Sequence, residues 1–461
     1  MHPYMFIILS FFSVILIGTI LLVMPFASKT GKSFGFLDSL FMSTSAVCVT
    51  GLSVMETSLG ADMTVYAKIV MAILMEIGGL SIITIGVFFF NIIGAKIGVS
   101  RGYLLRESLN QDTMKNILSL VKNIMIISFS IQLICALLNW YPFFEFLENS
   151  FPDQGHNISR ALGISLFHSS AAFNNAGFDI LEYHGNMYSL IGFSTDSGMV
   201  SNFSVYMVNY TTMFMIFTGG IGFVVIQDVI QNKRWKYYSL HTKITLIMTA
   251  ALIFVGTMII YFTDEKVSFT DALFTAITSR TAGFDTYNMS LLKDNPPAFI
   301  TIISLMFIGA SPCSTGGGVK TTTFAIILIA IYHFARGQKT KAFKKTIDND
   351  QIIKAFVLVA LSVMLVIVAT FFILITQPEF GTDRVLFEVI SAFSTTGLSM
   401  GITNMLNIGS KLVIIFLMIF GRLGILTVIG VLNKNWIHKD FDEIRYVEES
   451  VIIGWLRKRA F

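Results

Sequence analysis

Four segments of this 461-residue chain share one pattern: a Leu-Phe pair, then a short polar stretch that ends in glycine and an apolar residue. The copies run over 40–52, 166–178, 273–284 and 386–398. Glycine adopts backbone conformations that other residues avoid, so the carbonyl groups around it can turn toward one axis. A ring of four such loops can replace the water around a monovalent cation with carbonyl oxygens. The pattern therefore predicts ion selection.

The predicted ligands are backbone carbonyls at the glycine of each copy and at the two residues before it. They are Val49, Thr50 and Gly51; Asn175, Ala176 and Gly177; Thr281, Ala282 and Gly283; and Thr395, Thr396 and Gly397. No carboxylate lies in these stretches, which favours a weakly hydrated monovalent ion over Ca²⁺ or Mg²⁺. One such loop alone would be an ordinary glycine turn, but four copies in matching positions favour a filter.

The composition places these loops in a membrane protein. Hydrophobic residues make up 54% of the chain and charged residues 13%, and the mean hydropathy is +0.72. Soluble domains carry about 25% charged residues. Apolar runs of about 20 residues recur, the length that a bilayer core about 30 Å thick requires. We therefore expect an all-α polytopic protein in the lipid bilayer of the cell membrane.

The basic residues indicate the orientation of the chain. Of the 32 Lys and Arg, 21 lie in the polar stretches 94–122, 231–243, 334–354 and 434–461. Loops rich in these residues stay in the cytoplasm, so both termini are expected there. Because this placement follows membrane topology, the net charge of +4 predicts no nucleic-acid partner. The three cysteines and seven histidines are scattered, and no cluster predicts an enzyme or a covalently bound cofactor.

Each glycine copy lies between two long apolar segments, which predicts four span–pore loop–span repeats and eight spans. The repeats are expected at 1–92, 117–230, 231–333 and 351–433, with cytosolic loops at 93–116 and 334–350 and a cytosolic tail at 434–461. An acid precedes three of the Leu-Phe pairs: Asp38, Asp271 and Asp383. Since Asp is a favoured helix N-cap, we expect a short helix there whose negative C-terminal end points at the glycine loop.

The second span of each repeat carries a cluster of small residues, at 78–81, 219–222, 309–311 and 421–424. One interpretation is close packing between membrane helices, which small residues favour. The other is that the small residues let these helices approach the filter from behind.

The segments 173–178, 280–284 and 316–323 resemble the Trk/Ktr/HKT potassium transporters, and the match looks best to the bacterial Ktr membrane subunit. The resemblance covers nearly the whole chain. It implies four repeats with pseudo-fourfold symmetry around one pore, K⁺ at the filter, and a homodimer. It also implies a cytosolic ring of nucleotide-binding regulatory subunits. Stimulation by Na⁺ is associated with the Ktr branch, but no residue set in the sequence predicts a sodium site. In this family, glycine at all four filter positions goes with a preference for potassium.

The segment 298–332 is too long for one span, since a helix of that length would run about 52 Å at about 1.5 Å per residue. Its middle, 309–323, contains Pro312 and three consecutive glycines, which favour a break. By resemblance, this loop obstructs the pore as a gate; a packing kink is the other interpretation. The predicted gate residues are Gly309, Ser311, Pro312, Ser314, Thr315, Gly316, Gly317, Gly318, Lys320 and Arg422.

The partners of three charged residues within the spans stay open. Arg422 could pair with a carbonyl or with the gate loop, or could reach the lipid headgroups, and Glu76 could pair with Arg422 or with Lys320. A second function also stays open, since broken helices and internal repeats also build alternating-access cation carriers. The pattern of basic loops returns each repeat to the same side of the membrane, which favours a gated pore for potassium uptake.

Overall fold

The computed structural model describes residues 3–55, 58–81, 84, 117–150, 157–181, 200–265, 267–286 and 289–425. Within these ranges the regular secondary structure is helical apart from one two-stranded hairpin, formed by β1 (Lys341–Ala342) and β2 (Lys345–Thr346), and irregular loops join the elements. The predictions for the loop 93–116 and for the tail 434–461 lie outside the described residues.

Four of the described helices are long and apolar enough to cross a membrane. They are α1 (Pro3–Val23), α7 (Ile117–Ser150), α11 (Leu240–Thr263) and α15 (Asn349–Thr376). They coincide with the first span predicted for each repeat. Their outward faces carry many exposed large apolar side chains, as contact with lipid requires. The described part of the chain is therefore helical and of the membrane type.

The second helix of each repeat is shorter or bent. These helices are α4 (Val65–Gly79), α9 (Asn202–Gly220) with α10 (Phe223–Gln231), α13 (Pro296–Ile308) with α14 (Thr321–Ala335), and α17 (Ile408–Leu423). The pair α9–α10 is bent by 92° and would count as a fifth span. A helix thus lies at every predicted second span, but among the described helices only four or five satisfy the length and hydropathy of a span.

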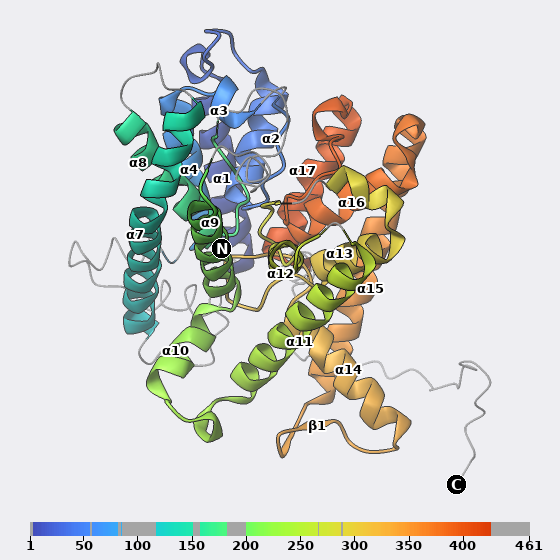
Figure 1. Ribbon diagram of the computed structural model, residues 1–461. Helices are drawn as coiled ribbons and strands as arrows, with labels where there is room; N and C mark the ends of the chain where they lie inside the picture. Colours follow the sequence, from blue (N-terminus) through green and yellow to red (C-terminus); the bar gives the residue numbers. More distant parts are fainter. Residues whose placement is uncertain are drawn as a thin grey trace.

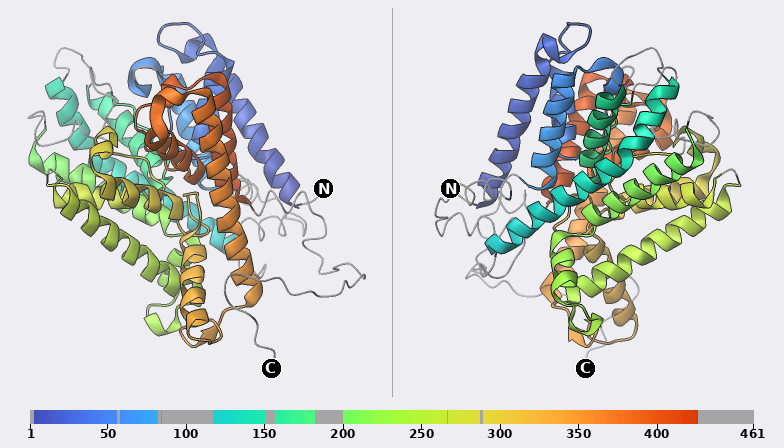
Figure 2. Two further views of the ribbon diagram at one scale, coloured as in Figure 1. Left: turned by 90° about the vertical axis from the view of Figure 1, so that its right-hand side faces the viewer. Right: turned by 60° about the vertical axis from the view of Figure 1, so that its left-hand side comes forward.

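A short helix precedes each glycine loop. These helices, called pore helices after the role predicted for them, are α2 (Phe36–Val47), α8 (Asn157–Phe173), α12 (Phe269–Thr278) and α16 (Gly381–Ser394). The remaining short elements are α3 (Leu59–Asp62), η1 (Pro25–Ala27), η4 (Trp235–Tyr237), η5 (Met289–Asp294), η6 (Pro378–Phe380) and η7 (Thr403–Met405). In the ribbon views α10 and the β1–β2 hairpin lie at the opposite end of the molecule from α3 (Figures 1 and 2).

The prediction that three aspartates are N-caps was wrong. In α12 the N-cap is Ser268, whose hydroxyl accepts a hydrogen bond from the Asp271 amide at 3.1 Å and donates one to the Asp271 carboxylate at 2.6 Å. Asp38 and Asp383 likewise lie within the first turn, not before it. Their charge still complements the positive N-terminal end of each helix dipole.

Small residues bring the second helix of three repeats against the end of the pore helix. A Cβ on Gly78 would overlap the carbonyl oxygen of Val47, the last residue of α2. A Cβ on Gly219 would likewise overlap the carbonyl oxygen of Phe173, and one on Gly421 would overlap that of Phe393. A side chain at any of these glycines would push the pore helix away. These contacts are the close helix packing of the first interpretation, and they place α4, α9 and α17 against the ends of the helices that precede the glycine loops.

Candidate functional site

The four glycine loops share one backbone conformation. The glycines have φ of +97° at Gly51, +64° at Gly177, +82° at Gly283 and +93° at Gly397. Two residues earlier, φ is +50° at Val49, +56° at Asn175, +73° at Thr281 and +53° at Thr395. Positive φ is unusual for the β-branched residues Val and Thr, and such strained backbone clusters at functional sites.

The four loops follow one another around a closed ring. A Cβ on Gly51 would lie 2.6 Å from the carbonyl oxygen of Ala176, and one on Gly177 would lie 2.6 Å from that of Ala282. A Cβ on Gly283 would lie even closer to the carbonyl oxygen of Thr396, and one on Gly397 even closer to that of Thr50. The carbonyl of the residue before each glycine therefore lies at the ring, and any Cβ there would displace one of these oxygens.

Each loop is fastened to its own pore helix before the glycine. The amide of the residue preceding the glycine donates a hydrogen bond back into the helix: Thr50 to Ser45, Ala176 to Ala171, Ala282 to Thr278 and Thr396 to Ser391, at 2.7–2.9 Å. In two of the loops a side chain of the helix also hydrogen-bonds the residue that follows the glycine. The Ser45 hydroxyl donates to the Leu52 carbonyl at 2.8 Å, and the Thr278 hydroxyl donates to the Phe284 carbonyl at 2.6 Å. The ring is thus held in one shape.

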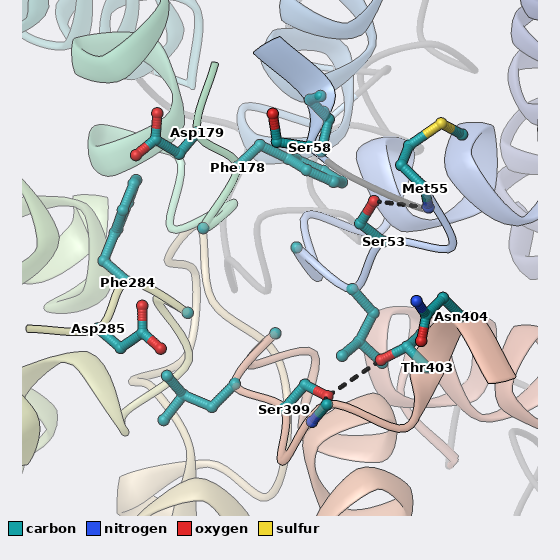
Figure 3. A pocket seen from close by; sticks show the side chains of 18 of the residues that line it. Ser53, Met55, Ser58, Phe178, Asp179, Phe284, Asp285, Ser399, Thr403 and Asn404 are labelled. Atoms are coloured by element: carbon teal, nitrogen blue, oxygen red, sulfur yellow. Dashed lines mark hydrogen bonds between the residues drawn. The ribbon is translucent and has the colours of Figure 1, made fainter. Parts of the chain in front are cut away.

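A polar cavity of about 180 Å³ opens on one side of the ring. All four glycines line it, together with the residue two positions after each glycine. These residues are Ser53, Asp179, Asp285 and Ser399. Figure 3 shows the two aspartates on one side of the cavity, across from Met55 and Asn404. The cavity therefore presents hydroxyl and carboxylate oxygens immediately before the ring, an arrangement that attracts cations.

The carboxyl group of Asp285 titrates near neutrality. Burial and, to a smaller extent, the negative charge of Asp179 together raise its pKa to about 7. An isolated Asp would titrate near pH 4. The charge of the cavity therefore changes across the physiological pH range.

A fully buried carboxylate stands behind the cavity. Glu388 of α16 accepts a hydrogen bond from the Ser399 hydroxyl at 2.9 Å and another from the Thr403 hydroxyl. Ser399 and Thr403 both line the cavity. Glu388 therefore positions two of the hydroxyl groups that an approaching ion meets.

The loop between α13 and α14 lies against the other side of the ring. Cβ atoms on Gly316 and Gly317 would overlap the hydroxyl groups of Thr281 and Thr395, which are filter-loop residues. The Thr315 hydroxyl contacts the second filter loop, at 3.2 Å from the Phe173 carbonyl and 3.3 Å from the Asn175 side-chain oxygen. The break predicted in 309–323 is thus present, and the segment contacts three of the four glycine loops.

Backbone hydrogen bonds fix this loop to the bend between α9 and α10. The amides of Ser311 and Thr315 donate to the carbonyls of Gly220 and Gly219, each at 3.1 Å. The Phe223 amide donates to the Cys313 carbonyl at 2.9 Å. A movement of α10 would therefore be transmitted to the loop.

The structure decides which partners the three charged residues of the spans take. Arg422 donates to the carbonyl of Thr315 in the loop 309–323 and to the carbonyls of Gly78 and Gly79 in α4. The Lys320 ammonium donates to the Gly316 carbonyl at 2.7 Å. Glu76 pairs with neither cation; its carboxylate accepts from the Ser170 hydroxyl at 2.7 Å. Both pairings suggested for Glu76 were therefore wrong.

Two features of the site were missed in the sequence. The ring of Ser53, Asp179, Asp285 and Ser399 is visible once the four copies are aligned on their glycines, because the same position is polar in all four. Glu388 is the one charged residue in the apolar part of α16, and a charge in such a helix signals a specific partner.

Comparison with known proteins shows the family. The sequence model of TrkH, described as a cation transport protein, matches residues 1–435. The chain is 36% identical to Ktr system potassium uptake protein B of Bacillus subtilis over 97% of this chain and 95% of that protein. It is 34% identical to the potassium/sodium uptake protein NtpJ of Enterococcus hirae, over 98% of each.

The fold agrees with this assignment. The crystal structure of the potassium transporter TrkH from Vibrio parahaemolyticus is similar with a TM-score of 0.68 and 18% identity, over 94% of this chain and 85% of that one. The chain therefore belongs to the TrkH family of cation transport proteins and is a multi-pass membrane protein, and the resemblance found in the sequence is confirmed.

Proposed function

We propose that this chain is the membrane subunit of a potassium uptake system, in which K⁺ passes through one pore selected by the four glycine loops. Both relatives named above are potassium uptake proteins by description. The observation that carries the proposal is the closed ring of Gly51, Gly177, Gly283 and Gly397, each facing the carbonyl before the next glycine. Neutral carbonyl oxygens in such a ring suit a weakly hydrated monovalent ion.

In this proposal the eight helical segments form four span–pore loop–span repeats with pseudo-fourfold symmetry around the ring. The cavity of Asp179 and Asp285 receives ions from outside the cell, and the loop 309–323 with Arg422 closes the path on the cytosolic side. Both termini are then cytoplasmic. The polar contacts between this loop and the filter loops support a gate that closes directly below the filter.

The proposal also includes the partners implied by the family. The chain forms a homodimer and is controlled by a cytosolic ring of nucleotide-binding subunits, since a Ktr system is named as a system of components. Stimulation by Na⁺ is part of the proposal, because one relative is named a potassium/sodium uptake protein. The bend between α9 and α10, hydrogen-bonded to the loop 309–323, offers a route from the cytosolic surface to the gate.

The test is ⁸⁶Rb⁺ flux into liposomes that contain the purified chain, with Na⁺ and Li⁺ as competitors. Gly177→Ser is the test variant, because its side chain would collide with the Ala282 carbonyl. Gly163→Ser is the matched control, since Gly163 lies on the preceding pore helix with no atom within 4 Å of its Cβ position. We expect potassium-selective flux that loses selectivity in Gly177→Ser and keeps it in Gly163→Ser. Flux that is absent, or indifferent to Gly177→Ser, would contradict the proposal and favour an alternating-access carrier.

A further inference from the structure

An apolar groove of about 450 Å³ lies between α11, α14 and the β1–β2 hairpin, at the lower end of the molecule in Figure 1. Ile247 and Met248 are among the residues that line it from α11, and Leu328 and Tyr332 are among those from α14. Its volume falls within the range of cavities that hold small ligands, about 300–1,000 Å³. The proposed ion pathway does not use this groove, since its lining residues belong neither to the glycine loops nor to the loop 309–323.

The groove opens on a surface that lipid would cover. The side chains of Ile247, Leu328 and Tyr332 are each about half exposed. α11 is one of the four described helices that are long and apolar enough to cross a membrane, and α14 is a shorter apolar helix. The walls of the groove offer water few hydrogen-bond partners. An apolar chain is therefore its expected occupant.

Basic side chains lie against the residues that line this groove. Lys341 is itself one of the lining residues. The ammonium group of Lys243 lies 5.9 Å from the ring centroid of Phe343, and the guanidinium carbon of Arg336 lies 4.4 Å from the ring centroid of Tyr332. Phe343 and Tyr332 both line the groove. An apolar groove is thus combined with three positive charges.

These cations have little acidic charge around them in the sequence. They belong to the segments 229–243 and 334–347, which together hold nine Lys or Arg and no Asp or Glu. Asp228, which precedes the first segment, already accepts hydrogen bonds from the Ser239 amide at 2.9 Å and from the Thr242 hydroxyl. The positive charge at the groove is therefore available to an anion from outside the chain.

Exposed aromatic side chains mark this end of the molecule as a membrane–water boundary. Trp235, Tyr237 and Tyr332 are all exposed at the surface. Trp and Tyr gather at the level of the lipid headgroups, because their rings are apolar and carry one polar group. Lipid headgroups are thus expected at the level of the basic side chains, with their acyl chains beside the groove.

We propose that this groove binds an anionic phospholipid, with an acyl chain between α11 and α14 and the phosphate group among Lys243, Arg336 and Lys341. An apolar chain that ends in a negative headgroup complements both parts of the site. Ammonium and guanidinium groups form strong, charge-assisted hydrogen bonds with phosphate oxygens. A lipid without net charge would fill the groove but would leave the positive charge of these three side chains uncompensated.

The groove is connected to the loop 309–323 through α14. This helix begins at Thr321, whose amide donates to the Ala310 carbonyl and whose hydroxyl donates to the Ser311 hydroxyl, each at 3.2 Å. The groove belongs to the structure in which the loop contacts the glycine loops, so a lipid that binds there stabilises this arrangement. Anionic lipid therefore opposes ion passage. This last step rests on the proposed function, whereas the binding of lipid does not.

The first measurement is native mass spectrometry of the purified full-length chain in detergent, titrated with dioleoylphosphatidylglycerol or dioleoylphosphatidylcholine. We expect the wild type to bind phosphatidylglycerol more tightly than phosphatidylcholine. Lys243→Gln/Lys341→Gln should weaken the binding of phosphatidylglycerol about tenfold or more, because each cation near the headgroup attracts anionic lipid. The matched control is Lys233→Gln/Lys354→Gln, which removes the same charge from exposed lysines that do not line the groove and should weaken binding far less.

A second pair of variants tests the apolar part of the site. Leu328→Trp would fill the groove and should displace the acyl chain, so it should weaken the binding of both lipids. Ile331→Trp is its control, since Ile331 is an exposed residue of the same helix that does not line the groove. The lysine variants keep the proposal testable if Leu328→Trp does not fold.

Four results would overturn the site. They are equal affinity for the two lipids, equal loss of binding in the two double variants, unchanged binding in folded Leu328→Trp, and a dimer that excludes lipid and that Leu328→Trp separates. The second would show a general attraction to the basic surface, and the fourth would show that another copy of the chain fills the groove.

The second measurement is ⁸⁶Rb⁺ flux in phosphatidylcholine liposomes with and without phosphatidylglycerol. Phosphatidylglycerol should lower the flux through the wild type and through Lys233→Gln/Lys354→Gln, and should lower it less in Lys243→Gln/Lys341→Gln. Equal effects of the lipid on all three proteins would overturn the connection to the loop 309–323. Absence of Rb⁺ flux in every protein would contradict the proposed function alone, since the binding of lipid is measured without transport.

Discussion

The guanidinium of Arg422 donates a hydrogen bond to the backbone carbonyl of Thr315, and with the same group it holds the carbonyls of Gly78 and Gly79. One side chain of α17 thus joins the loop between α13 and α14 to the end of α4. In the proposed pathway this guanidinium lies below the filter and would also repel K⁺ ions that approach it. The contact would then oppose ion passage in two ways.

Arg422→Ala should raise the flux of ⁸⁶Rb⁺ through the chain reconstituted without other subunits. A hydrogen bond from a charged group contributes about 1.5–3 kcal/mol, so its loss should increase the open fraction about tenfold or more, provided that the closed state dominates. Lys411→Ala is the control, since Lys411 is on the same helix and pairs with Asp38 at 2.7 Å, away from the loop. Unchanged or reduced flux in folded Arg422→Ala protein would argue against a closing role.

Flux at low K⁺ concentration should depend on external pH through Asp285. Its pKa is raised to about 7, so the carboxylate is charged above this pH and neutral below it. Lowering the external pH from 8 to 6 should therefore reduce Rb⁺ uptake, because the cavity loses a charge that attracts cations. In Asp285→Asn, Rb⁺ uptake should be slow at both pH values and should no longer depend on pH. If the variant keeps the wild-type profile, another group is responsible.

Glu388→Leu should destabilise the protein, because it removes the acceptor of the Ser399 and Thr403 hydroxyl groups and leaves them only the 3.1 Å contact with each other. A buried polar group without a partner costs about 1–3 kcal/mol, so a clear fall in the unfolding temperature is expected. Glu388→Gln keeps an acceptor oxygen and should lose much less. Equal stability of the two variants would show that these hydrogen bonds contribute little.

Gly78→Ala should lower both the stability and the ion selectivity. The added Cβ would overlap the Val47 carbonyl, and overpacking of this kind costs about 1–3 kcal/mol. The displaced end of α2 would carry the first filter loop with it. Gly163→Ala is the control, because its Cβ meets no atom within 4 Å. The measurements are the unfolding temperature and the ratio of Rb⁺ flux to Na⁺ flux. Equal values for Gly78→Ala and Gly163→Ala would refute the steric argument.

Local features of the sequence predicted the pore helices, the filter glycines and the break in the third repeat. Each of these depends on residues a few positions apart, such as the consecutive glycines Gly316–Gly318 next to Pro312. The helix starts were less certain, since Ser268 and Asp271 are both good N-cap residues and only the three-dimensional turn shows that Ser268 takes this role. Sequence periodicity could not distinguish between them.

Contacts between repeats could not be predicted. Arg422 and Thr315 are 107 residues apart, and the charge of Arg422 suggested Glu76 as a partner just as well as a carbonyl. Packing decided the outcome, because Gly78 and Gly421 bring α4 and α17 against the ends of their pore helices and leave carbonyl oxygens, not the carboxylate, within reach of the guanidinium.

The glycine ring is built from four unequal stretches of one polypeptide, in which Thr50, Ala176, Ala282 and Thr396 take equivalent places. In a channel of four identical chains, one codon change alters every quarter of the filter at once. Here a single mutation alters one quarter and leaves three intact. If the ring is the filter proposed above, evolution can adjust the preference for K⁺ over Na⁺ by changing one of its four parts at a time.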